Sequence, residues 1–174
     1  MRRTTRTLLI SVFGLWASAA AAAQGNTQEG PAQGSRVEIG GSLGYTNFVD
    51  DSALHHCVAG ASARIRIVRG LGFAPELTYM YRSRQDRDFI LMPNLVWEFR
   101  RGKKVVPYVI GGVGILNHRE SWDHFDWNST GRFISGGFGT KVFLNERFFV
   151  SPEVRIGWEP HIRVGVTLGC VLIK

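Results

Sequence analysis

Strict alternation of apolar residues from Phe148 to Ile173 constrains the fold more than any other feature of this chain. Every second residue is apolar on both sides of a break at Glu159 and Pro160. Successive side chains of a β-strand point to opposite faces of the sheet, so the pattern predicts two strands with one apolar face each. Two strands alone are not stable, and the rest of the chain is therefore expected to continue the same sheet.

The alternation recurs six more times, with turn or loop residues between the segments. The predicted strands comprise residues 36–47, 57–68, 71–82, 88–100, 105–116, 130–144, 148–158 and 162–173. Arg69 and Gly70 predict a tight turn, and residues 117–129 are the longest predicted connection. Four prolines interrupt predicted strands and remove ladder hydrogen bonds, so bulges or strand starts are expected there. They are Pro75, Pro93, Pro107 and Pro152.

The first 23 residues resemble a targeting segment rather than part of the fold. Three arginines at positions 2, 3 and 6 precede an apolar run over residues 8–22, and small residues precede Gln24. This layout predicts a secretory signal peptide over residues 1–23. Residues 24–35 are polar with glycine and proline and predict a flexible lead-in, which leaves residues 36–174 as one domain.

Charge and cysteine content exclude some functions. Of the 21 basic residues, three lie in the signal peptide, which leaves 18 against 14 acidic residues, a net charge of +4. These charges are spread without a basic stripe, so nucleic-acid binding is not predicted. Cys57 and Cys170 survive in an exported chain, where a disulfide is chemically permitted. They lie at opposite ends of their predicted strands, so we expect two free cysteines.

The composition of the two faces indicates which one meets lipid. Glycine crowds the polar face, as a narrow lumen requires, and aromatic residues of the apolar face lie toward the strand ends, as in the girdles of membrane barrels. The polar face also carries both signs of charge, which are tolerable inside only when paired. The predicted lumenal charge network comprises Glu38, Arg64, Arg66, Glu76, Glu98, Lys141, Glu153, Arg155 and Arg163. Eight strands leave an interior that side chains fill, so an open solute pore is not expected.

Three strand patterns resemble those of small eight-stranded outer-membrane β-barrels, the family of the OmpA transmembrane domain and OmpX. They are Val37-Glu-Ile-Gly-Gly-Ser-Leu-Gly-Tyr45, Pro107-Tyr-Val-Ile-Gly-Gly-Val-Gly-Ile115 and Val164-Gly-Val-Thr-Leu-Gly169. The resemblance covers residues 36–174 and implies an all-β, eight-stranded antiparallel up-and-down transmembrane β-barrel of the outer membrane. It also implies periplasmic termini, contact with outer-membrane lipids, lipopolysaccharide and the assembly machinery, and a monomer without cofactors.

The segment from His118 to Trp127 is the most distinctive stretch outside the predicted strands. Its aromatic residues Trp122, Phe125 and Trp127 are candidate contacts to lipopolysaccharide or a partner protein. Its histidines and carboxylates lack the tight spacing of a metal site, so none is assigned. The favoured interpretation is an exposed loop whose aromatic residues cap the rim of the barrel.

The predicted role is structural or interactive: a lipid-embedded scaffold that presents loops outward. No catalytic, cofactor or metal residue is assigned. Two alternatives remain open at this point. One is a lipid A-modifying enzyme, an acyltransferase or deacylase, for which Ser52 and His161 are the residues to test. The other is a secreted soluble barrel whose apolar face points inward.

Overall fold

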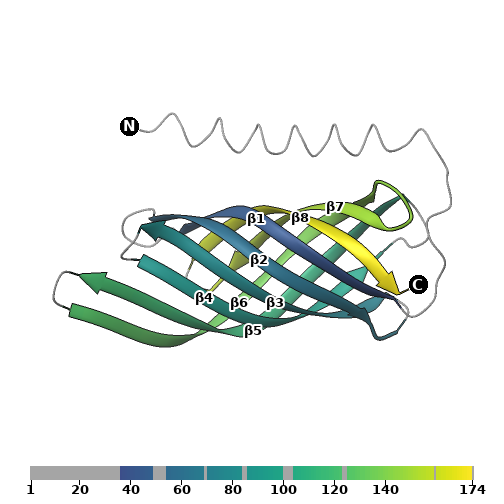
Figure 1. The fold of residues 1–174 in the computed structure, drawn as a ribbon. Helices are drawn as coiled ribbons and strands as arrows, with labels where there is room; N and C mark the ends of the chain where they lie inside the picture. Colours follow the sequence, from purple (N-terminus) through teal and green to yellow (C-terminus); the bar gives the residue numbers. More distant parts are fainter. Residues whose placement is uncertain are drawn as a thin grey trace.

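A computed structural model describes residues 36–48, 54–68, 70–83, 86–99, 104–122, 125–158 and 160–173 of the chain. Eight antiparallel strands follow one another in sequence order and close into a barrel (Figure 1). The strands are β1 (Val37–Phe48), β2 (Leu54–Arg66), β3 (Leu71–Ser83), β4 (Asp86–Glu98), β5 (Val105–Trp122), β6 (Phe125–Phe143), β7 (Phe148–Gly157) and β8 (His161–Ile173). The predicted eight-stranded up-and-down architecture is confirmed. The predicted signal peptide and lead-in lie outside the described residues, which contain no helix long and apolar enough to cross a membrane.

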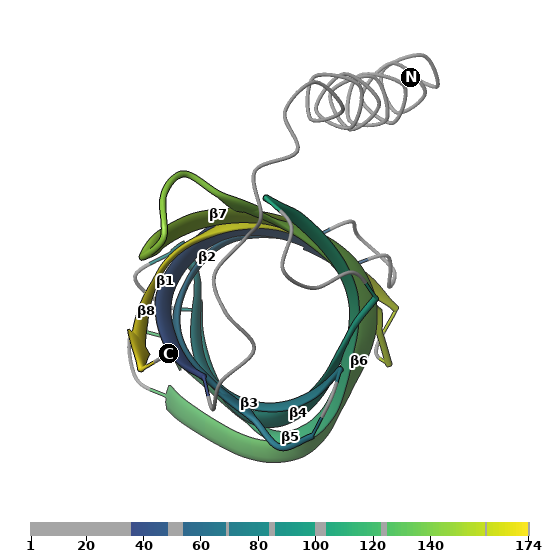
Figure 2. The same cartoon turned by 90° about the vertical axis from the view of Figure 1, so that its right-hand side faces the viewer.

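The barrel has two different ends. At the terminal end, Val37 of β1 pairs with Ile173 of β8 and closes the cylinder, as Figure 2 shows from that side. The β2–β3 turn lies at the same end, where Gly70 adopts a φ of 94° that favours glycine, which confirms the predicted tight turn. At the opposite end, here called the hairpin end, β5 and β6 extend beyond the other strands (Figure 1).

The hairpin end corrects the prediction of a long loop over residues 117–129. β5 and β6 pair without interruption from Val105↔Val142 to Trp122↔Phe125, so only residues 123–124 separate them. The Asn117 amide donates hydrogen bonds to Asn128 Oδ1 at 2.9 Å and Thr130 Oγ1 at 3.3 Å, which couple the two strands. The apolar alternation that revealed the other strands is absent over residues 117–129, so the sequence pattern does not predict this pairing.

The prolines are accommodated without the predicted bulges. The register shifts that the structure records lie between Val37 and Glu38 and between Tyr81 and Ser83. Beside Pro75, Pro93 and Pro152 the pairing lapses on one side of the strand and resumes in the same register. Only Pro107, the third residue of β5, lies at a strand start as expected. Each missing N–H therefore removes backbone hydrogen bonds to one neighbouring strand without changing the register of the sheet.

The apolar face points outward, as predicted. In β8, Leu168 is 64% exposed whereas His161 is 2% exposed, and the two classes of residue alternate along the strand. Outward aromatic rings include Tyr79 and Phe89 toward the hairpin end and Trp97 toward the terminal end. A soluble barrel would place these apolar residues in its core, so the alternative of a secreted soluble barrel is wrong.

Both cysteines are free, as expected. Cys57 pairs across the sheet with Tyr45, near the hairpin end of β1, whereas Cys170 pairs with Ile39, near its terminal end. The stretch of β1 from Ile39 to Tyr45 separates them.

Candidate functional site

The middle of the barrel is occupied by ion pairs centred on Glu76 of β3. Its carboxylate accepts hydrogen bonds from Arg155 Nη2 at 2.6 Å and Arg163 Nη2 at 2.7 Å, and Thr78 Oγ1 donates to it at 2.9 Å. The two arginines lie on β7 and β8, across the lumen from β3. Alternation places all four side chains inward, and closure of the sheet brings them together.

A second carboxylate, Glu153, completes this arrangement. It accepts hydrogen bonds from Arg155 Nε at 2.5 Å and from the Tyr108 hydroxyl at 2.8 Å. Tyr108 also contacts the Ser151 hydroxyl at 2.8 Å, and Asn94 Oδ1 accepts a hydrogen bond from Arg155 Nη1 at 3.3 Å. We call Glu76, Thr78, Asn94, Tyr108, Ser151, Glu153, Arg155 and Arg163 the central cluster. Its two carboxylates balance its two guanidiniums, which is the condition for burying charges.

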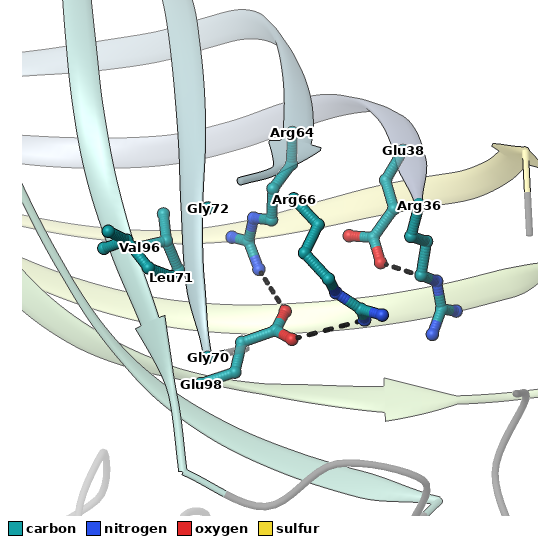
Figure 3. A pocket seen from close by; sticks show the side chains of 9 residues that line it. All are labelled: Arg36, Glu38, Arg64, Arg66, Gly70, Leu71, Gly72, Val96 and Glu98. Carbon is teal, nitrogen blue, oxygen red and sulfur yellow. Dashed lines mark hydrogen bonds and ion pairs between the residues drawn. The ribbon is translucent and has the colours of Figure 1, made fainter. Parts of the chain in front are cut away.

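A second group of charges, the terminal cluster, lies nearer the terminal end. Lys141 Nζ donates hydrogen bonds to Glu38 Oε2 at 2.6 Å and to Glu98 Oε1 at 2.7 Å. Arg64 and Arg66 lie 3.4 and 3.9 Å from the Glu98 carboxylate (Figure 3). The cluster comprises Arg36, Glu38, Arg64, Arg66, Glu98 and Lys141.

Arg36, the member of the terminal cluster that precedes β1, lies against the ring of Phe143. Its guanidinium carbon lies 4.5 Å from the centre of the Phe143 ring, a cation–π distance. Burial lowers the pKa of the Arg36 guanidinium; Glu38 acts in the opposite direction, and the neighbouring Arg66 lowers that pKa further. Positive groups are thus crowded at this end of the lumen.

An apolar layer separates the central cluster from the hairpin end. It comprises Val58, Met80, Ile90, Met92, Leu116 and Phe133, all of them buried. The Phe133 ring stacks on the imidazole of His161 at 4.7 Å between centroids. Beyond this layer, His118 Nδ1 lies 2.5 Å from Asp88 Oδ1 and His56 Nε2 lies 3.8 Å from Asp88 Oδ2. Within the described residues, no group of three or more histidine, cysteine or acidic side chains is arranged to hold a metal ion.

The nine residues predicted to form the lumenal charge network lie in the interior and group into two clusters, which meet where the Arg64 guanidinium carbon lies 4.5 Å from the centre of the Tyr108 ring. Glu76, Glu153, Arg155 and Arg163 belong to the central cluster, and the other five belong to the terminal cluster. The sequence reasoning assigned no role to Arg36, Asn94, Tyr108 or Asp88. Asn94 and Tyr108 occupy inward positions of β4 and β5, so alternation by itself was a sufficient signal for those two. Asp88 continues the same alternation two residues before Ile90, whereas Arg36 precedes β1, where alternation gives no signal.

The remaining predicted residues have different outcomes. The backbones of Trp122, Phe125 and Trp127 lie in the β5–β6 hairpin, and their side chains lie outside the described part of the structure. Ser52 also lies outside it. His161 is buried between the rings of Phe48 and Phe133.

An apolar outer wall, a closed sheet and an interior of paired charges together define a transmembrane β-barrel, because only closed barrels and helices satisfy their backbone groups in lipid. Residues 8–163 match the family model described as outer membrane protein beta-barrel domain, and the chain belongs to this family.

Solved structures share the fold of this chain. The N-terminal β-barrel domain of Pseudomonas aeruginosa OprF has a TM-score of 0.65 at 16% identity, covering 80% of this chain and 100% of that one. Neisserial surface protein A has a TM-score of 0.65 at 12% identity, covering 80% and 99%. Ail, the attachment invasion locus protein of Yersinia pestis, has a TM-score of 0.56 at 13% identity, covering 79% and 95%. No curated protein is a significant sequence match to this chain.

Proposed function

We propose that this protein is exported to the outer membrane, where it acts as a structural scaffold that presents the β5–β6 hairpin at the cell surface for interaction. The observation that carries this proposal is the hairpin itself, which extends beyond the rest of the wall at the end opposite the termini. If the termini are periplasmic, as the family resemblance implies, this hairpin lies outside the cell. Its candidate contacts are Trp122, Phe125 and Trp127, and its candidate partners are lipopolysaccharide or an extended segment of another protein.

The free edge of β6 suits such an interaction. The β6–β7 ladder ends at Ser135↔Gly157, and Trp158 N donates the next backbone hydrogen bond to Ile134 O at 2.9 Å. Among the described residues, no strand pairs with this side of β6 from residue 125 to residue 133. An unpaired strand edge is a template onto which another extended chain adds by backbone hydrogen bonding.

The interior argues against a pore and supports the scaffold role. Charged clusters and buried apolar side chains occupy the described part of the cylinder, and the largest fully buried side chains include Tyr108, Phe133 and Lys141. Moving a solute along the axis requires breaking these contacts, and breaking buried ion pairs is costly. We therefore propose a closed, monomeric and non-enzymatic barrel that the outer-membrane assembly machinery inserts.

Cysteine labelling of intact cells tests the orientation. Ser129→Cys on the hairpin and Arg147→Cys in the β6–β7 turn both replace exposed residues, each introduced with Cys57→Ser and Cys170→Ser. A maleimide attached to a polymer too large for porins should label the Ser129→Cys variant in intact cells. It should label the Arg147→Cys variant only after the cells are opened.

The opposite pattern, or labelling of neither variant in intact cells, would contradict surface presentation of the hairpin. Lipid A from the same cells provides the second measurement. Its acyl number by mass spectrometry should equal that of cells without the protein. A changed number that His161→Ala restores would favour the lipid A-modifying enzyme instead.

A further inference from the structure

The terminal cluster carries more positive than negative charge. In the described part of the interior, it contains four cations, Arg36, Arg64, Arg66 and Lys141, against two carboxylates, Glu38 and Glu98. The central cluster, in contrast, is balanced. Unbalanced charge removed from water is unfavourable, so a compensating anion would stabilise this end of the barrel.

Arg36 has an unused donor in this cluster. Its side chain is 7% exposed, and its Nε lies 3.0 Å from Glu38 Oε1 as an ion pair. Its Nη2 is buried and has no hydrogen-bond partner. A buried polar atom without a partner is uncommon and indicates a missing ligand or strain. Glu38 and Glu98 do not fully compensate the arginine charges, because Lys141 already binds both carboxylates.

A small hollow adjoins these donors. It is lined by Arg36, Arg64 and Arg66 together with Glu38, Glu98 and the backbone that follows the β2–β3 turn (Figure 3). Its volume of about 10 Å³ is room for one oxygen-sized atom. The hollow therefore suits one oxygen of a larger anion whose remainder lies at the barrel mouth. Guanidinium groups match this chemistry, because their N–H donors pair with phosphate and carboxylate oxygens in the same plane.

We propose that the terminal end of the barrel is an oxyanion site, in which Arg36 and Arg66, supported by Arg64, bind a phosphate group. In the proposed orientation this end faces the periplasm. The phosphate comes either from solution or from the headgroup of a phospholipid in the inner leaflet. The site lies at the opposite end of the molecule from the hairpin and does not depend on the role proposed for it.

Titration calorimetry with inorganic phosphate tests the site on the protein in phosphatidylcholine nanodiscs, with chloride keeping the ionic strength constant. We expect saturable binding that Arg36→Gln weakens about tenfold or more, because a hydrogen bond to a charged group is lost. Arg66→Gln should weaken binding in the same direction. Arg119→Gln, an exposed arginine on the hairpin, is the matched control and should bind phosphate as the unaltered protein does.

Nanodiscs that contain phosphatidylglycerol distinguish the two sources. A weaker apparent affinity for phosphate in these discs identifies a lipid headgroup as competitor, and an unchanged affinity identifies free phosphate; both support an oxyanion site. The proposal is overturned if the unaltered protein shows no saturable binding, if chloride binds equally well, or if the variants at Arg36 and Arg66 bind like the unaltered protein. Heat-dependent gel migration reports whether each variant is folded, and Arg66→Gln suffices if Arg36→Gln does not fold.

Discussion

Each charged residue of the central cluster depends on an oppositely charged neighbour to compensate its buried charge. Glu76 compensates two guanidiniums, those of Arg155 and Arg163, at positions where water is excluded. A buried pair is not strongly stabilising relative to apolar residues, but removing one partner leaves an uncompensated charge. The consequence of a substitution here is therefore larger than the count of lost hydrogen bonds suggests.

Glu76→Gln should lower the free energy of unfolding by about 3–5 kcal/mol, because it leaves one guanidinium charge without a counterion. Arg155→Leu should also destabilise the protein, since it leaves two carboxylates, Glu76 and Glu153, against one guanidinium, that of Arg163. Urea unfolding in lipid vesicles, followed by tryptophan fluorescence, measures both. Arg119→Gln on the exposed part of β5 is the control and should change stability by less than about 0.5 kcal/mol. Equal urea midpoints for all variants would mean that the ion pairs do not stabilise the barrel.

At the scale of the strands, the distance between neighbouring strands depends on which positions are glycine. Gly137 of β6 faces inward, and a Cβ there would overlap the Val154 carbonyl oxygen and lie 2.8 Å from Arg155 Cα. Gly136 points to the opposite face, where the nearest atom to an added Cβ is Ile110 O at 3.7 Å. Two adjacent glycines of one strand therefore have different roles.

Gly137→Ala should destabilise the protein by about 1–3 kcal/mol, because overpacking against a backbone forces β6 and β7 apart. Gly136→Ala meets only ordinary van der Waals contact and should be neutral within about 0.5 kcal/mol. The same vesicle unfolding assay compares them directly. A smaller effect at Gly137 than at Gly136 would contradict the close approach of β6 and β7.

The whole molecule is turned inside out relative to a soluble protein: its outer surface is apolar and its interior polar. Leu168 lies near the middle of the apolar band, in register with Gly41 of β1, and is 64% exposed. Such a residue contacts acyl chains in a membrane, whereas in a soluble protein it would be wetted and tolerant of charge. The polarity of residue 168 therefore affects stability only if the residue lies in a membrane.

Leu168→Arg should lower the free energy of unfolding in vesicles by about 2–4 kcal/mol, the cost of a cation near the bilayer midplane. Ser129→Arg places the same side chain on the exposed hairpin, outside the apolar band, and should have little effect. If both substitutions were equally tolerated, the apolar band would not be embedded in lipid.

The local sequence determined the strands, their inward and outward faces and the class of protein. Alternation needs only neighbours in the chain, so Ile162 and Arg163 reveal their opposite faces without a partner strand. The tertiary structure decided what alternation cannot encode. The split of charges between Glu76 and Glu98, the exposed β6 edge and the unused donor of Arg36 depend on which strands closure brings together. The β5–β6 hairpin escaped prediction for a related reason, because residues 117–129 lack apolar alternation and their strand order depends on the pairing of β5 with β6.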